Sequence, residues 1–135
     1  MAINKDYEAP PSLNLKDNEP RYKSWFNNLY YNLSIKNHQT ITAAAAINLD
    51  SRFVRLQSSG SGYAVTLAAP TIPGVYKVIQ KTSNNADNIT LLMTNLIGQP
   101  SGTTLTWNSQ NDIVVLVSCD NSKWYIVSYN GVTFT

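Results

Sequence analysis

The sequence predicts a mainly β protein: an antiparallel β-sandwich or jelly-roll-like domain of about eight strands, preceded by an extended arm and one amphipathic helix. From Gln39 onward, Gly, Asn, Ser and Pro separate short apolar segments at intervals near the ~8–12 residues typical of sandwiches and barrels. A helical spacing of apolar residues occurs only in residues 20–34. With 135 residues, 43% of them hydrophobic, we expect one domain plus an extension.

Alternation assigns the faces of several expected strands. The strands are expected at 40–49, 53–57, 63–68, 75–81, 89–94, 103–107, 112–118 and 124–129. Residues at every second position are large and apolar, and the intervening ones are β-branched hydroxyl residues, which suit a wet pleated surface. The inward set is Tyr63, Val65, Leu67, Ile89, Leu91, Met93, Leu105 and Trp107, and the outward set is Thr66, Thr90, Thr104 and Thr106.

Residues 112–135 depart from this alternation. The run 113–117 is apolar at every position, a turn follows at 120–123, and 124–129 form the returning strand of a hairpin. A strand with one wet face alternates, so an unbroken apolar run indicates that both faces are covered. The cover is expected from a second sheet or from another chain.

Residues 1–20 read as an arm. Pro10, Pro11 and Pro20 interrupt any helix, and Leu13 and Leu15 are paired apolar residues in an otherwise polar stretch. Such a segment cannot bury enough surface to fold alone, so we expect it to order along another protein. The expected division is an anchoring arm and helix at 1–38 and a β-sandwich domain at 39–135.

Residues 20–34 predict the one helix. Its apolar stripe needs a partner, because about four turns are marginal in isolation. Two partners stay open: the chain's own β-domain, or a helical bundle or host particle. The stripe, with Leu13 and Leu15, is the expected anchoring interface: Tyr22, Trp25, Phe26, Leu29, Tyr30 and Leu33.

The tetrad Ala43–Ala46 also breaks the pattern, because four small residues fill a core poorly but let backbones approach closely. A tightly packed strand or a helical turn would explain it, and so would a symmetry axis where copies of the chain meet.

Charge and targeting patterns exclude several classes of function. Ten basic and eight acidic residues are scattered along the chain, without the Lys and Arg cluster that nucleic-acid binding requires. No segment approaches the ~20 consecutive apolar residues of a membrane span, and the start is no signal peptide. We therefore expect no nucleic acid or membrane partner and synthesis in a cytoplasm.

No pattern of catalytic or metal-binding residues is present. His38 is the single histidine and Cys119 the single cysteine, so multi-histidine and Cys-based metal sites are excluded. The acids of the β-region adjoin predicted turns, where an Asp bonds to nearby backbone. We expect no enzyme, no cofactor and no metal; a hydrolase would need a carboxylate pair that nothing in the spacing supports.

The aromatic residues offer one alternative function. Trp107, Trp124 and Tyr125 could stack on sugar rings as a carbohydrate- or receptor-binding module that contacts a cell-surface glycan. Aromatic residues in strands more often belong to the core or to a subunit interface.

Two stretches resemble known proteins. One is Pro10-Pro11-Ser12-Leu13 through to Tyr30, and the other comprises Ala69-Pro70, Gly74–Ile79, Asn88–Leu91 and Lys123–Ser128. They resemble small virion structural proteins of tailed bacteriophages, of the head-fibre, capsid-decoration and short tail-fibre types. The resemblance implies a homotrimer in the virion, whose amino-terminal segment holds other virion proteins of the capsid or tail and whose β-domain projects outward.

Overall fold

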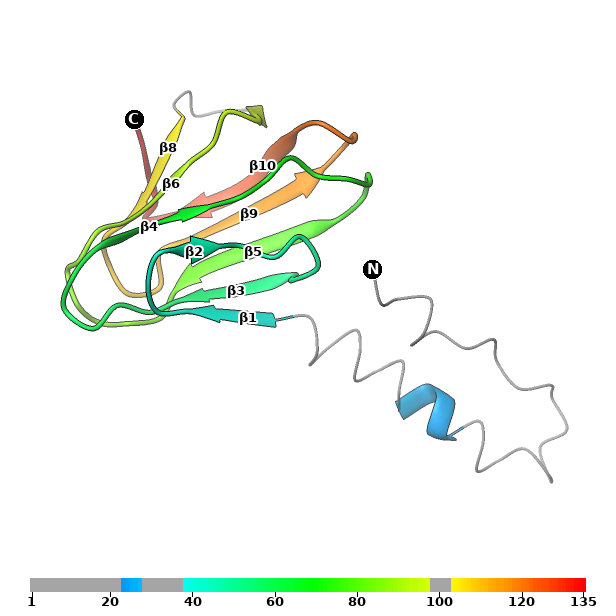
Figure 1. Cartoon of the computed structure of the whole chain (residues 1–135), viewed down its shortest axis with the longest axis horizontal. Coiled ribbons are helices and arrows are strands. Elements are labelled where there is room, and N and C mark those ends of the chain that lie inside the picture. Colours follow the sequence, from blue (N-terminus) through cyan, green and yellow to red (C-terminus); the bar gives the residue numbers. More distant parts are fainter. Residues whose placement is uncertain (1–22, 28–37, 98–102) are drawn as a thin grey trace, which may run out of the picture. The chain divides into compact units, whose positions relative to one another are not determined.

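The computed structural model describes residues 23–27, 38–97 and 103–135 (Figure 1). The chain divides into two units, Met1–Asn37 and His38–Thr135, beside the expected boundary at 38/39. In the first unit the described part is a helical turn at 23–27, within the helix predicted for 20–34. The rest of that helix and the arm predicted for 1–20 lie outside the described residues.

The second unit is built from two β-sheets, which confirms the mainly β prediction. Sheet A has six strands in the order β1-β3-β5-β9-β10-β7, and sheet B has five in the order β11-β8-β6-β4-β2. The described strands are β1 (His38–Ile41), β2 (Ala45–Ala46), β3 (Phe53–Leu56), β4 (Tyr63–Thr66), β5 (Tyr76–Lys81), β6 (Ile89–Leu92), β7 (Leu96–Ile97), β8 (Thr104–Trp107), β9 (Ile113–Ser118), β10 (Trp124–Asn130) and β11 (Thr133–Phe134).

The prediction of antiparallel sheets is wrong, because both sheets are mixed. Strands β1 to β6 join the two sheets alternately, so β1, β3 and β5 are parallel neighbours in sheet A and β2, β4 and β6 in sheet B. In this part of the chain, each strand that returns to a sheet after one strand in the other sheet runs in the same direction as the strand before it in that sheet. Antiparallel pairing begins later, where β9 pairs with β5 and β10, and β8 with β6 and β11.

The strand boundaries differ from prediction mainly at short elements. The strand expected at 40–49 is two strands, β1 and β2, one in each sheet. Strands β7 and β11 have two residues each, too few to show an alternating pattern. The tetrad Ala43–Ala46 is exposed, with Ala45–Ala46 forming the edge strand β2, so it is not the tightly packed strand considered above.

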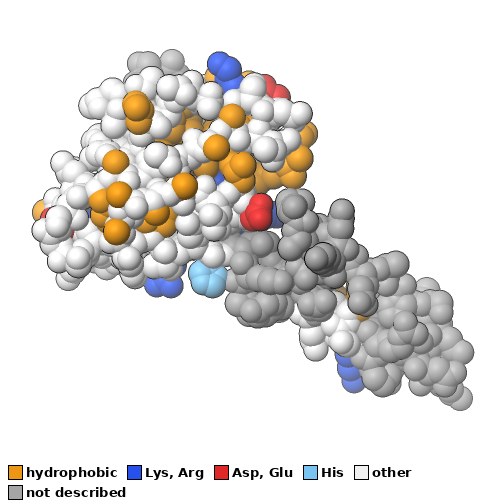
Figure 2. Space-filling view, in the orientation of Figure 1, with side chains coloured by type: hydrophobic (Ala, Val, Ile, Leu, Met, Phe, Trp, Pro, Cys, Tyr) orange, Lys and Arg blue, Asp and Glu red, His pale blue; other side chains and the backbone are white. Residues whose placement is uncertain are grey.

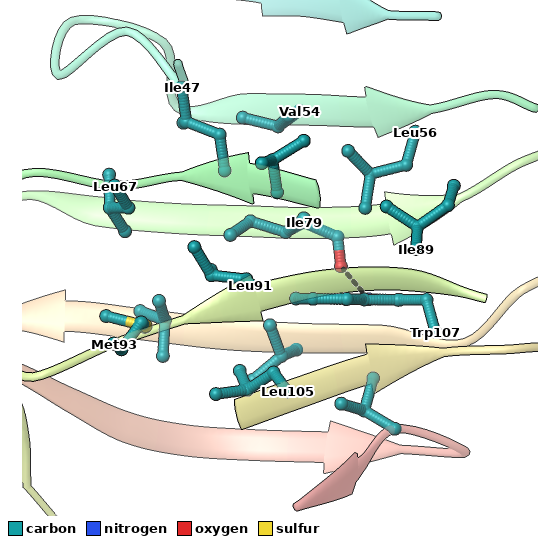
Figure 3. Close-up of a cluster of buried hydrophobic side chains, with 14 of the residues drawn as sticks. Ile47, Val54, Leu56, Leu67, Ile79, Ile89, Leu91, Met93, Leu105 and Trp107 are labelled. Carbon is teal, nitrogen blue, oxygen red and sulfur yellow. Dashed lines mark hydrogen bonds between the residues drawn. The ribbon is translucent and has the colours of Figure 1, made fainter. Parts of the chain in front are cut away.

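A hydrophobic core lies between the sheets (Figure 3). Alternation correctly assigned Ile89, Leu91 and Leu105 of sheet B to the core. They are buried together with Val54 and Ile79 of sheet A. Figure 3 shows the Trp107 indole of β8 reaching the Ile79 carbonyl of β5, to which its Nε1 donates over 3.3 Å. The core therefore joins the two layers through apolar packing and through a hydrogen bond from one sheet to the other.

Acidic residues fix the turns, as expected. Oδ1 of Asp120 accepts hydrogen bonds from the backbone N–H groups of Ser122 and Lys123, closing the predicted β9–β10 hairpin. These bonds hold the pKa of Asp120 below its usual value. Oδ2 of Asp112 accepts from the N–H groups of Asn108 and Ser109 in the turn before β9. Both carboxylates thus stabilise the turns beside β9.

Candidate interaction surface on sheet A

The two faces of sheet A have different surroundings, because one packs on sheet B and the other faces away from it. Strand β9 alternates between buried Val114 and Leu116, which face sheet B, and half-buried Ile113, Val115 and Val117, which face away from it. The strand register extends this alternation across the sheet into three rows. We define the outer face of sheet A by those rows: a first row of Tyr76, Val117, Tyr125 and Ile97; a second of His38, Phe53, Val78, Val115 and Ser128; and a third of Thr40, Arg55, Gln80, Ile113 and Asn130.

The outer face of sheet A is rich in large apolar groups. Its first row is hydrophobic throughout, and the neighbouring second row continues with Phe53, Val78 and Val115. Tyr76 is 54% exposed, although such a ring is costly to leave in water. Beside the face, a bulge in β10 leaves Val127 51% exposed. Arg55 is the only Lys, Arg, Asp or Glu residue in the three rows.

The outer face of sheet B has a different composition. Its positions alternate with buried core residues, as the sequence predicted, and hydroxyl side chains dominate them. Leu92, 64% exposed, is the large apolar exception. We define the outer face of sheet B as Ala46, Ala64, Thr66, Thr90, Leu92, Thr104, Thr106 and Thr133.

Charged side chains are sparse on the surface as well. On the side shown in Figure 2 they are few, and hydrophobic side chains gather in several groups among polar ones. This agrees with a charged content of only 13%.

The tryptophans proposed for glycan stacking lie inside the sandwich. Trp107 is 0% exposed and Trp124 1% exposed, and the Trp124 indole donates from Nε1 to the Ala68 carbonyl over 2.9 Å. Neither ring offers a stacking face to solvent. Tyr125, the third proposed residue, is half-buried in the first row of the outer face of sheet A.

Two lysines on the inner face of sheet A were missed by the sequence reasoning. Lys77 and Lys81 alternate with Ile79 on β5 and are fully buried. Nζ of Lys77 donates to the carbonyls of Asn48, at 2.8 Å, and Ser51. The period-2 alternation of β5 could have revealed both lysines, because Tyr76 and Val78 occupy the opposite face.

Lys77 also contacts an aromatic ring, and Lys81 repeats the carbonyl arrangement at the other end of the strand. Nζ of Lys77 lies 5.7 Å from the centre of the Trp124 ring. Burial lowers the pKa of Lys77 to about 8, against a smaller opposing effect of Asp50.

Nζ of Lys81 donates to three carbonyls, those of Asn85, Asp87 and Asn108. Burial lowers the pKa of Lys81 too, opposed by Asp87 and Asp112. Both ammonium groups therefore hold loops at the ends of the sandwich.

The remaining polar candidates show no grouping for chemistry. Among the described residues, no group of three His, Cys, Asp or Glu side chains could hold a metal ion. Oδ2 of Asp87 accepts from the Ser58 hydroxyl over 2.7 Å, while His38 is an exposed residue that begins β1. Cys119 is a free, exposed thiol after β9. No helix in the described ranges is long and apolar enough to cross a membrane.

The anchoring stripe is described only in part. In the helical turn at 23–27, Phe26 is 55% exposed and Trp25 is half-buried. The other expected anchoring residues lie outside the described residues: Leu13, Leu15, Tyr22, Leu29, Tyr30 and Leu33.

No protein-family model and no curated protein sequence matches the chain.

Proposed function

We propose that this chain is a non-enzymatic structural protein of a bacteriophage particle. Its amino-terminal arm and helix anchor it to the capsid or tail, and its β-domain projects as a homotrimer in a decoration or fibre role. The observation that carries the proposal is the outer face of sheet A, which has the composition of a covered sheet face. The resemblance of the amino-terminal stretch and the β-region to phage fibre and decoration proteins supplies the setting.

The proposed mechanism is burial of apolar surface between polypeptides. Removing apolar surface from water stabilises an assembly by roughly 25 cal/mol per Å². A half-exposed tyrosine such as Tyr76 and the half-buried valines beside it would each contribute when covered. Within one chain they contribute less, because water still reaches them.

The polar groups of the β-domain support a structural role. Lys77 and Lys81, which a lowered pKa would suit to chemistry, are instead enclosed and bonded to loop carbonyls. The carboxylates of Asp112 and Asp120 are taken up by turn N–H groups. These charged groups stabilise the fold. The proposed association therefore depends on other residues at the surface.

Incorporation into particles tests the anchoring part of the proposal. Phe26→Asp replaces an exposed ring of the expected anchor with a charged carboxylate. We therefore expect far fewer copies of the chain per purified particle, as counted by quantitative mass spectrometry. Leu92→Asp is the matched control, because Leu92 is similarly exposed but lies on the outer face of sheet B. Particles that lack the wild-type chain, or that carry Phe26→Asp at wild-type occupancy, would overturn the proposal.

A further inference from the structure

We propose that the outer face of sheet A packs against the same face of further copies of this chain, around a symmetry axis parallel to the strands, with β5 and β9 nearest that axis. The inference rests on the proposed function, in which this face is covered on assembly. It adds the occupant of the face and the orientation of the copies.

The edges of both sheets are poor sites for strand addition, which leaves the faces for association. The described edge strands β2, β7 and β11 have two residues each, and such short edges offer few free backbone groups. The remaining edge strand, β1, has four residues, and the side chain of its Gln39 bonds to backbone groups at 46 and 48. Nε2 of Gln39 donates to the Ala46 carbonyl over 3.0 Å, and Oε1 of Gln39 accepts from the Asn48 N–H over 2.8 Å.

The register makes the outer face of sheet A self-complementary about an axis along the strands. A rotation about such an axis places each cross-strand row of one copy opposite the same row of the next copy. The strands of the next copy then follow in the reverse order. Tyr76 on β5 then meets Val117 on β9 of the neighbour, a large side chain against a small one. Val78 likewise meets Val115. An axis across the strands would instead set the hydrophobic first row against the third row, where Gln80 and Asn130 lie.

The charges on the face also favour further copies as the occupant. Arg55 lies on β3, away from the β5–β9 line, and the same axis brings it toward Asn130 of the neighbour rather than toward another arginine. One charge gives little basis for selecting a foreign partner by charge complementarity. Long-range repulsion between copies is also weak, because residues 38–135 carry nearly balanced charges: Arg52, Arg55, Lys77, Lys81 and Lys123 against Asp50, Asp87, Asp112 and Asp120.

Sedimentation velocity with light scattering on the full chain tests the inference. We expect the wild type to associate with rising concentration, with a trimer as the end state. Val115→Lys should raise the concentration for half-association on the order of tenfold or more, since it places an ammonium at the centre of the apolar rows. Thr106→Lys is the matched control on the outer face of sheet B and should associate as the wild type does. A wild type that stays monomeric, or equal association of both variants, would overturn the inference.

Cross-linking provides a second readout without a buried charge. In a Cys119→Ser background, Val117→Cys should form intermolecular cross-links with a short bis-maleimide, because β9 lies beside the proposed axis. Thr106→Cys in the same background should not. Equal cross-linking of the two would contradict the arrangement even if Val115→Lys failed to fold.

Failure of the inference is distinguishable from failure of the proposed function. A chain that is monomeric in solution but present on particles overturns self-packing and leaves the virion role standing. A chain that self-associates but is absent from particles overturns the virion role and leaves the self-packing.

Discussion

The outer faces of the two sheets share one scaffold and differ in what they present to the surroundings. Threonines are repeated across the outer face of sheet B, whereas valine, isoleucine and aromatic side chains occupy most of the central strands of the outer face of sheet A. Both faces lie opposite the same core, so the demands of that core do not explain the difference. The chain alternates strictly where one side is wet, and loses alternation where a second partner is expected.

The largest expected effect concerns the inner faces of the two sheets, which pack against each other in the core. Trp107→Ala removes a fully buried indole and its hydrogen bond to the Ile79 carbonyl, so we expect the free energy of unfolding to fall by about 3–5 kcal/mol. Tyr125→Ala, on the outer face of sheet A, should cost clearly less in dilute solution, below the association range. Urea denaturation measures both. Similar losses for the two variants would contradict the assignment of inner and outer faces.

The next effect concerns the passage from sheet A to sheet B after β10. Gly131 has φ of +76°, and a Cβ there would meet the Asp112 carboxylate. Gly131→Ala should therefore cost about 1–3 kcal/mol by thermal or urea unfolding. Gly60→Ala is the control, because Gly60 also has a positive φ of +117° but has no heavy atom near the position of an added Cβ. An equal loss of stability at both positions would show that the positive φ alone causes it, without a contribution from the contact with Asp112.

A smaller expected effect is a pH dependence of the free energy of unfolding. It distinguishes the inner face of sheet A from the outer face, because the inner face holds the two lysines. The folded pKa of Lys77 is about 8 and its ordinary value is 10.5, so between these values the unfolded chain binds more protons. Stability should therefore rise with pH from about 8 to about 10, by at most about 1.4 kcal/mol per pH unit for one group. Lys81 acts in the same direction.

Tyr63 acts in the opposite direction at higher pH, because burial raises its pKa. The experiment is urea denaturation at each pH for the wild type and for Lys77→Met. The variant should show a reduced slope, because the titrating group is gone. An unchanged slope would mean that Lys77 is not the source.

The smallest expected effect is on the folding of the single chain. Val115→Thr and Thr106→Val exchange the side-chain types of the two outer faces. In dilute solution each should change the free energy of unfolding by less than about 1 kcal/mol. Their association should still differ, with Val115→Thr weakening it and Thr106→Val leaving it unchanged. Loss of association in both variants would remove the distinction between the faces.

Local patterns in the sequence predicted the inward and outward residues well. Alternation identified Ile89, Leu91, Leu105 and Trp107 as core residues, and the polar turn after β9 identified the hairpin. The unbroken run in β9 marked a strand with apolar residues on both of its sides. These features depend on neighbours along the chain, which a sequence displays directly.

Properties that depend on distant segments were not predictable in this way. Turn residues show that the chain reverses but not which sheet it enters next, so the parallel pairing of β1, β3 and β5 was missed. Trp107, which alternation had placed inward, and Trp124 were also candidates for surface stacking, because composition alone does not show which aromatic rings the second layer covers. The carbonyls that bind Lys77 come from a loop more than twenty-five residues earlier, and no local pattern indicates them.

Hydroxyl-radical footprinting tests the central claim, that the outer face of sheet A is covered on assembly, most directly. Tyr76 and Leu92 are exposed to 54% and 64% in the single chain and represent the outer faces of sheet A and sheet B, respectively. Labelling of the dilute chain and of the chain in intact particles should show Tyr76 protected in the particle and Leu92 labelled nearly as before. Equal labelling of Tyr76 in both states would contradict the account.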